Sequence, residues 1–279
     1  MNSLRISKLA RRYSLILVLL VLAFIWLMPL LWIISTSLRL PKTSFTLPPV
    51  FFPVDFVKEN YLEVFKKLPF SKFIFNSVFV TAIGTCAQIC VTTMAAYSFA
   101  RIKFFGKNTI FIMILAGMMI PIQSTIVPKF IIMRNLSLMN SLWALILPAI
   151  IDPLAIFLLR QFMLTIPISY DESAYIDGAG RFTIFSKIIV PMTLPTISVI
   201  VTVRSLVLWN DFFQPLIFIN SYDYMTLPLG LTILKGQMGS GSISEVLAGV
   251  VLSFIPPLLL YVFCQKQLMN AVILTGLKS

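Results

Sequence analysis

Apolar residues fill six long stretches of this chain, and shorter polar segments separate them. Their approximate limits are residues 14–37, 75–100, 109–127, 142–159, 194–216 and 246–264. A helix needs about 20 apolar residues to cross the hydrocarbon of a bilayer. A helix also satisfies its backbone groups internally, whereas a β-barrel would need short segments of alternating polarity. The pattern therefore predicts an all-α integral membrane protein with six transmembrane helices.

Composition supports this class, because 58% of the residues are hydrophobic and the mean hydropathy is +0.95. The net charge of +12 could indicate nucleic-acid binding, but the basic residues form no dense run. They lie at the edges of the apolar stretches, where contact with anionic lipid explains them better. We expect membrane lipid as a partner and no nucleic acid.

The distribution of Lys and Arg predicts the orientation. One set of alternate loops holds 12 basic residues and the other holds nine, most of them in one longer loop with acidic residues. The short basic tail before residue 14 has the most weight in setting the orientation. The apolar stretch 14–37 that follows it is too long for a signal peptide. Both termini are expected in the cytoplasm, with the segment between spans four and five. The predicted organisation is a tail and first span (1–38), an outer loop (39–71), a transmembrane domain with spans two to six (72–264) and a cytoplasmic tail (265–279).

The segment between spans four and five is unusually polar, with the sequence DESAYIDGAGRF at residues 171–182. Ser169 and Glu172 have the spacing of a capping box, and Gly178 can end a helix with a positive φ. Apolar residues then recur at helical spacing up to Pro191. The pattern predicts a short helix, a turn and a second helix leading into the membrane. By itself it leaves open whether this elbow, residues 167–191, rests on lipid or on a cytosolic protein.

The residues of the elbow also carry a family resemblance. Glu172-Ser173-Ala174, Asp177-Gly178-Ala179, Phe185, Ile188 and Pro191 resemble the EAA loop of binding-protein-dependent ABC importer permeases, with the pattern E-A-A, D-G-A and F-x-x-I-x-L-P. Ser173 and Val190 are mild departures. Stretches such as Asn76-Ser77, Ala95-Ala96-Tyr97 and Trp209-Asn210-Asp211-Phe212 are similar to carbohydrate permeases of the maltose MalG type.

The resemblance implies a function and a set of partners. The elbow would be a coupling helix docked on an ATP-binding subunit dimer, and the chain would work with a second, MalF-like permease and an extracytoplasmic solute-binding protein. The complex would import a sugar or oligosaccharide across a prokaryotic plasma membrane by alternating access. ATP and Mg would bind the partner ATPase, and this chain would hold no cofactor. A glycerophosphodiester or polyol is an alternative solute.

Enzymatic chemistry has little support in the sequence. The chain has no His, and the glycine-rich segment 236–243 has Ser242 where a phosphate loop needs Lys. Three cysteines, Cys86, Cys90 and Cys264, lie in apolar stretches and are expected as buried packing residues rather than metal ligands. We expect a transport subunit that is not an enzyme and binds no metal.

Polar residues inside the spans are candidates for the translocation pathway. They are Asp152, Arg204, Trp209, Asn210 and Asp211. A charge at mid-membrane costs about 2.5–3.5 kcal/mol on insertion scales. Arg204 is therefore expected either in an interhelical ion pair, for which an acid of the second permease is one candidate partner, or at the substrate. Asp152 before Pro153 predicts either a break in span four or a polar contact. An ion-coupled carrier is less favoured, because only Asp152 and Asp211 could relay ions.

Overall fold

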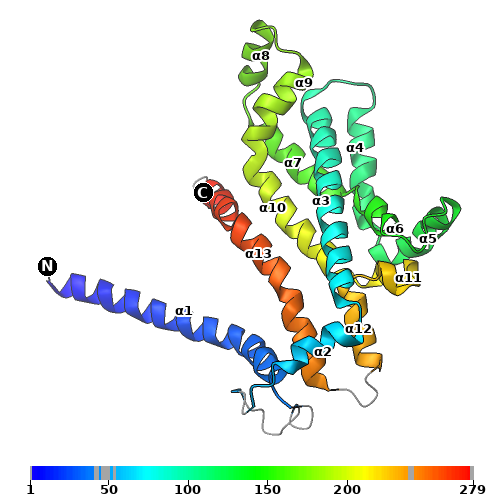
Figure 1. Cartoon of the computed structure of the whole chain (residues 1–279). Coiled ribbons are helices and arrows are strands. Elements are labelled where there is room, and N and C mark those ends of the chain that lie inside the picture. The colour runs from blue at the N-terminus through cyan, green and yellow to red at the C-terminus, as the bar shows by residue number, and fades with distance from the viewer. Residues whose placement is uncertain (1, 41–43, 45–50, 53–54, 238–241, 277–279) are drawn as a thin grey trace. The chain divides into compact units, whose positions relative to one another are not determined.

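A computed structural model describes residues 2–40, 44, 51–52, 55–237 and 242–276, and only the backbone of 2–11, 234–237 and 266–276. Within these residues every regular element is a helix (Figure 1). The longer helices are α1 (Asn2–Ser37), α2 (Glu59–Lys67), α3 (Phe70–Arg101), α4 (Lys107–Ala116), α5 (Ile126–Asn135), α7 (Pro153–Thr165), α8 (Ser169–Ile176), α10 (Val190–Trp209), α12 (Leu227–Gln237) and α13 (Ile243–Gly276). The shorter ones are α6 (Trp143–Ile146), α9 (Arg181–Ile184), α11 (Phe213–Phe218), a π-helix at Phe185–Ile189 and 3-10 turns at Gly117–Met119, Ile122–Thr125, Leu147–Ala149 and Tyr222–Tyr224. Parts of the predicted outer loop 39–71, the segment 236–243 and the tail 265–279 lie outside the described residues.

Four described helices are long and apolar enough to cross a membrane, and two bent helix pairs raise the number to six if each pair is one span. The four are Arg12–Ser37, Phe70–Arg101, Arg181–Trp209 and Ile243–Gln265. They contain or overlap four of the predicted spans. The all-helical membrane fold is therefore confirmed, while the number of crossings stays between four and six.

The predicted third span, 109–127, is not one straight helix. Lys107–Met119 and Ile122–Asn135 meet at an angle of 103°. Ile120 between them has extended backbone angles, φ −82° and ψ 119°. Pro121 explains the break, because a proline disfavours the helical conformation of the residue before it and offers no N–H to the helix.

The predicted limits of spans four and five also change. Trp143–Ala149 and Pro153–Thr165 form a pair bent by 41°, and the extended Asp152 lies at the break that its sequence position predicts. The fifth span begins at Arg181, earlier than the predicted residue 194, because the π-helix joins α9 to α10 without interruption. It ends at Trp209, so residues 210–216 do not continue the helix as predicted.

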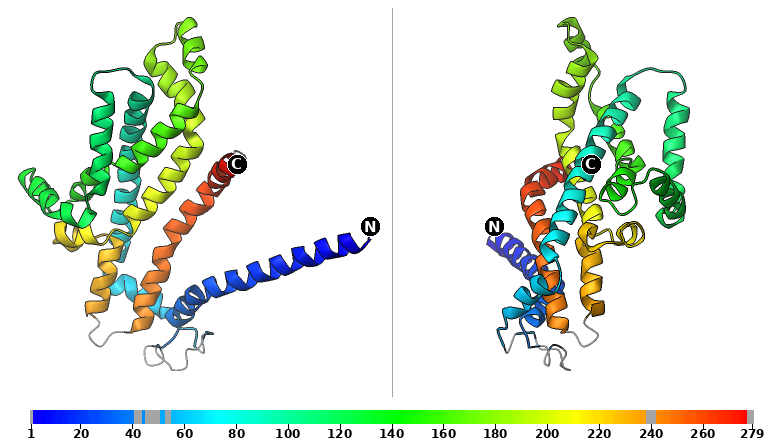
Figure 2. Two further views of the ribbon diagram at one scale, coloured as in Figure 1. Left: turned by 180° about the vertical axis from the view of Figure 1, so that it is seen from behind. Right: turned by 45° about the vertical axis from the view of Figure 1, so that its right-hand side comes forward.

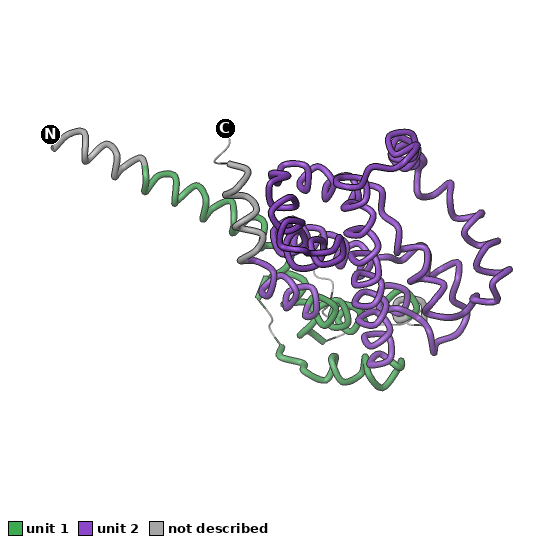
Figure 3. Tube along the Cα trace, turned by 90° about the horizontal axis from the view of Figure 1, so that it is seen from above, with its two compact units in different colours: residues 1–69, 231–254 green, residues 70–230, 255–279 purple. Residues whose placement is uncertain are grey.

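The described chain divides into two compact units, residues 1–69 with 231–254 and residues 70–230 with 255–279 (Figure 3). In the second unit, α3, α7 and α10 pack against one another (Figure 2). A cluster of buried side chains from these helices continues into α8 and α9: Ala96, Tyr97, Ala155, Leu159, Met163, Ile166, Ala174, Ile184, Ile189, Ile197 and Ile200. The elbow is thus packed on the core of its own unit.

In the first unit, polar contacts secure the end of α1. The Asn60 amide donates to the carbonyl oxygens of Ser37 and Arg39, both at 2.8 Å, and the hydroxyls of Ser37 and Tyr61 lie 2.7 Å apart. These bonds satisfy carbonyl groups that a helix end leaves without partners. Along α1 itself, none of the most apolar 18 residues is buried inside the chain.

Candidate functional site

Helix α8 ends in a tight glycine turn at the centre of the predicted coupling motif. Gly178 has φ +80°, its N–H donates to Tyr175 O at 3.0 Å, and the N–H of Ala179 donates to Ala174 O at 2.9 Å. This pair of bonds is the Schellman arrangement, which favours Gly because side chains are strained at positive φ. The prediction that Gly178 ends the helix is confirmed.

The predicted capping box at the start of α8 is not formed. The helix begins one residue early, its N-cap is Ile168, and no side chain caps it. Ser169 therefore lies inside the first turn, while the amides of Asp171 and Glu172 both donate to Ile168 O, at 2.9 and 3.1 Å. A capping side chain must come from a residue with non-helical backbone angles, so Ser169 has lost that role.

A buried ion pair attaches α8 to α3 instead. Arg101 Nε lies 3.3 Å from Asp171 Oδ2, and the two side chains are only 8% and 6% exposed. Arg101 also donates to Ile166 O at 2.7 Å, just before the elbow. Nearby, Arg160 donates to Phe99 O at 3.0 Å and stacks on the Phe111 ring. Two arginines that the sequence assigned to lipid-facing loops therefore hold helices of the elbow region together.

The residues of the motif divide between an exposed face and a packed face. Glu172, Ser173, Asp177 and Gly178 are exposed, whereas Ala174 is 8% exposed and belongs to the core of the unit. The Ala174 side chain thus faces the core of this unit, where a small residue lets α8 pack on the chain itself, and its predicted place at a docking contact stays a prediction. Exposed apolar residues that the motif did not mark accompany the polar face: Ile168, Tyr170, Tyr175, Ile176 and Phe182.

The second half of the motif packs inward. The Phe185 ring centroid lies 5.1 Å from that of Tyr97 on α3, and Ala179 and Ile188 contact the same core cluster. Pro191 is exposed and follows the π-helix within the continuous helix Arg181–Trp209. These residues fix how α8 continues into the long helix, so a displacement of α8 would be transmitted to α10.

Two of the predicted pathway residues, Arg204 and Asp152, form an ion pair between helices, and the neutral Gln88 bridges them. These three residues make up the charged trio. Arg204 Nε lies 3.3 Å from Asp152 Oδ2 and donates to Gln88 Oε1 at 2.7 Å. Gln88 in turn donates to Asp152 Oδ2 at 3.2 Å. The expected interhelical ion pair is present, and its acid lies in this chain rather than on another subunit.

Asp152 has a second task in this trio. Its Oδ1 accepts hydrogen bonds from the N–H groups of Leu154 and Ala155, at 2.9 and 3.2 Å, and so caps α7. Both interpretations of this residue hold, because it marks a helix break and makes a polar contact. The trio therefore fixes the break relative to α3 and α10.

Sequence reasoning missed Gln88, which is fully buried and bridges the two charges. A lone Gln within the apolar stretch 75–100 was the available signal, since intramembrane polar residues seek partners. The sequence likewise did not reveal the ion pair of Asp171, because its partner Arg101 is 70 positions earlier in the chain.

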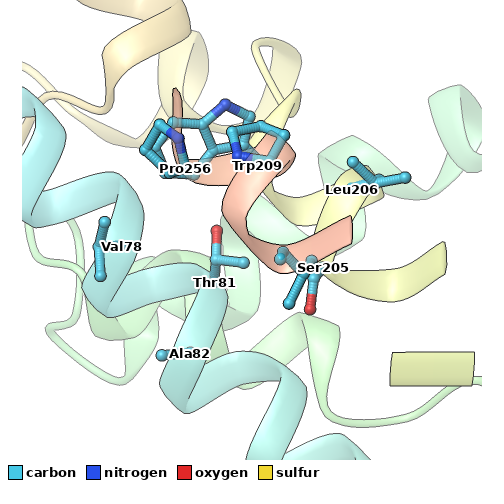
Figure 4. A pocket seen from close by; sticks show the side chains of 9 residues that line it. Val78, Thr81, Ala82, Ser205, Leu206, Trp209 and Pro256 are labelled. Carbon is cyan, nitrogen blue, oxygen red and sulfur yellow. The ribbon is translucent and has the colours of Figure 1, made fainter. Parts of the chain in front are cut away.

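Trp209 lines a mainly apolar cavity of about 180 Å³ together with residues of α3 and α13. Figure 4 shows it beside Pro256, with the Thr81 hydroxyl turned toward it. The Trp209 side chain is 6% exposed. Trp209 therefore packs against neighbouring helices and offers no open ring face.

Asn210 and Asp211 follow the end of α10. Asn210 is exposed and its amide donates to Leu206 O at 2.8 Å. Asp211 Oδ1 accepts from the N–H groups of Phe213 and Gln214, at 3.1 and 3.3 Å, and so caps α11. Burial raises the pKa of the Asp211 carboxyl, while these bonds and Lys129 oppose that rise. Of the five predicted pathway residues, only Asn210 is exposed.

The cysteines differ from their prediction. Cys86 and Cys90 are exposed on α3 and Cys264 is intermediate, so they do not fill the core of this chain. Within the described residues, no group of three His, Cys, Asp or Glu side chains could hold a metal ion. The described residues thus present an elbow packed on its own unit and two ion pairs between helices.

Comparison with known proteins agrees with these features. The family described as "Binding-protein-dependent transport system inner membrane component" matches residues 88–272. An arabinooligosaccharides transport system permease protein, AraQ, of Halalkalibacterium halodurans is 32% identical over 92% of this chain and 93% of that protein. A polygalacturonan/rhamnogalacturonan transport system permease protein, YtcP, of Bacillus subtilis is 29% identical over 94% and 96%.

A solved structure has the same fold. It is the crystal structure of a bacterial ABC transporter involved in the import of the acidic polysaccharide alginate, and one of its chains superimposes with a TM-score of 0.78. The match covers 92% of this chain and 96% of that one, at 23% identity.

Proposed function

The chain belongs to the family of binding-protein-dependent transport system inner membrane components, and we propose that it is a transmembrane permease subunit of an ABC importer for a sugar or oligosaccharide. The observation that carries this proposal is the elbow at residues 167–191, where the family motif coincides with a partly exposed helix that packs on the core of its own unit. Relatives named for arabinooligosaccharide and polygalacturonan transport support the solute class. Members of this family lie in the plasma membrane.

In the proposed mechanism, the exposed face of α8 docks on an ATP-binding subunit. Glu172, Ser173, Asp177 and Gly178 make the polar contacts, and the neighbouring Ile176 adds an apolar side chain that is 86% exposed. ATP and Mg bind that partner, and its closure pushes α8. Because Arg101 and Phe185 attach α8 to α3 and the core, the movement reaches α10 and the broken fourth span.

The proposed pathway lies beside the charged trio. Arg204 and Asp152 shape its wall by holding the helix break, and Asn210 is positioned to contact a solute hydroxyl. A second permease completes the pathway, and a solute-binding protein delivers the sugar from outside. The uncovered apolar surface of α1 favours lipid or this second permease as its neighbour.

This function is tested by uptake into proteoliposomes. The chain is reconstituted with its second permease and ATPase, and labelled arabinooligosaccharide is supplied with the binding protein. We expect uptake that requires both ATP and the binding protein. Uptake driven by an ion gradient without ATP would contradict the proposal and favour a secondary carrier.

A further inference from the structure

A polar cavity lies between the end of α3 and the elbow, and none of the four motif residues proposed to make polar contacts with the ATPase lines it. It has a volume of about 210 Å³ and is lined by Tyr97, Arg101, Ile102, Lys103, Ile168, Asp171, Tyr175 and Arg181. The volume is several times the roughly 30 Å³ that a water molecule occupies in the liquid. A phosphate-sized group therefore fits inside.

The cavity carries more positive than negative charge. Three of its residues are cationic and one, Asp171, is acidic. Asp171 is already paired with Arg101 at 3.3 Å. Among the described residues, neither Lys103 nor Arg181 has an ion-pair partner, although both line the same hollow. Two cations without an ion-pair partner in the described part of the chain line one cavity, and this excess of positive charge favours the binding of an anion there.

The remaining lining suits a phosphate ester. The hydroxyls of Tyr97 and Tyr175 are hydrogen-bond donors, and Ile102 and Ile168 supply an apolar edge for the carbon atoms of an ester. Tyrosines and basic residues are also typical of the level of lipid headgroups, where anionic lipid attracts Lys and Arg.

We propose that this cavity binds a phosphate group, which would join Lys103 after α3 to Arg181 after the glycine turn. The bound phosphate holds α8 against α3 and so stiffens the elbow. The same chemistry could come from an anionic lipid headgroup or from soluble phosphate. The proposal relies on the proposed function only for the orientation that puts the cavity at the cytoplasmic surface.

Binding is measured on the purified full chain by native mass spectrometry, with phosphatidylglycerol as the probe. Lys103→Gln with Arg181→Gln removes the two unpaired cations. We expect binding to weaken about thirtyfold, the product of two headgroup–cation contacts. The matched control is Lys107→Gln with Lys187→Gln, which removes the same charge on the same predicted side and should bind phosphatidylglycerol like the unmodified chain.

Further measurements identify the source of the phosphate group and control for misfolding of the variants. Displacement by inorganic phosphate assigns the site to the phosphate group alone, while binding that resists it assigns the site to a lipid headgroup. Lys103→Arg with Arg181→Lys keeps the charges and should retain binding. Equal binding of phosphatidylcholine, unchanged binding by the glutamine variant, or loss in the charge-preserving variant would each overturn the proposal. Since no ATP or transport partner is present, failure here is distinguishable from failure of the transport assay.

Discussion

Arg204 is a charge within an apolar helix, and its environment shows how the chain limits the cost. Asp152 neutralises it at 3.3 Å and Gln88 accepts its Nε–H at 2.7 Å. A partly buried pair stabilises a fold mainly through the penalty for removing one partner. The trio also joins three helices, so removing one member should lower the stability of the packing among all three.

Asp152→Asn tests this at the residue scale. The amide oxygen of Asn can still cap α7, but the charge of Arg204 loses its partner. We expect the free energy of unfolding to fall by about 1.5–3 kcal/mol, the usual range for a hydrogen bond to a charged group. Thermal or denaturant unfolding of the purified chain in detergent measures it.

The control is Asp211→Asn, another capping acid, which makes no ion pair within the described residues and should lose less stability. A double variant, Asp152→Asn with Arg204→Met, should recover part of the loss because no lone charge remains. If the single and double variants are equally unstable, the two residues are not coupled.

At the scale of elements, the elbow has two sides with different tasks. Its inner side, with Ala174 and Asp171, packs on the chain, and its outer side is available to a partner. Gly178 lies at the end of α8, where an added Cβ would meet no atom within 4 Å. A larger side chain there changes the outer surface without a clash inside the chain.

Gly178→Leu separates docking from folding. The strain of a side chain at positive φ should cost about 1 kcal/mol of stability, while stimulation of the ATPase by the loaded binding protein should be lost. Gly106→Leu is a matched control, because Gly106 has φ +73° and lies in the loop between α3 and α4, outside the coupling motif. ATPase and uptake assays on the assembled complex measure both. Intact stimulation in the Gly178 variant would show that the glycine turn is not the point of contact.

At the scale of the whole molecule, the bent pairs decide the topology. If Lys107–Met119 with Ile122–Asn135 and Trp143–Ala149 with Pro153–Thr165 each cross the membrane, there are six spans. If both pairs re-enter on the same side, there are four. In the six-span arrangement, the loop between the pairs lies outside and the elbow lies inside.

Single cysteines at Lys66, Leu136 and Ser173, in a chain whose native cysteines are replaced by Ala, distinguish these arrangements. With an impermeant maleimide on intact cells, we expect labelling at Lys66→Cys and Leu136→Cys but not at Ser173→Cys. Inside-out vesicles should give the reverse. If Leu136→Cys is labelled only in the preparation in which Ser173→Cys is labelled, the result supports four crossings. Labelling of Ser173→Cys on intact cells would show that the orientation is the reverse of the predicted one.

The sequence by itself determined the features that depend on local chemistry. Apolar runs predict membrane helices because a helix satisfies all its backbone groups within its own segment in lipid. Gly178 predicts a turn because the readiness to adopt a positive φ is a property of glycine itself. The break at Asp152-Pro153 follows in the same way. The spacing from Glu172 to Pro191 was sufficient for the family resemblance.

Only the tertiary structure decided which residues meet. Asp171 pairs with Arg101 and not with its own helix end, Gln88 joins Asp152 to Arg204, and Ala174 faces the core. The sharp bend at Ile120-Pro121 belongs here too, since an apolar pattern does not reveal the direction that a chain takes after a proline. The physical reason is that these contacts depend on how α3, α7 and α10 pack, whereas residue patterns within one helix report only its own faces.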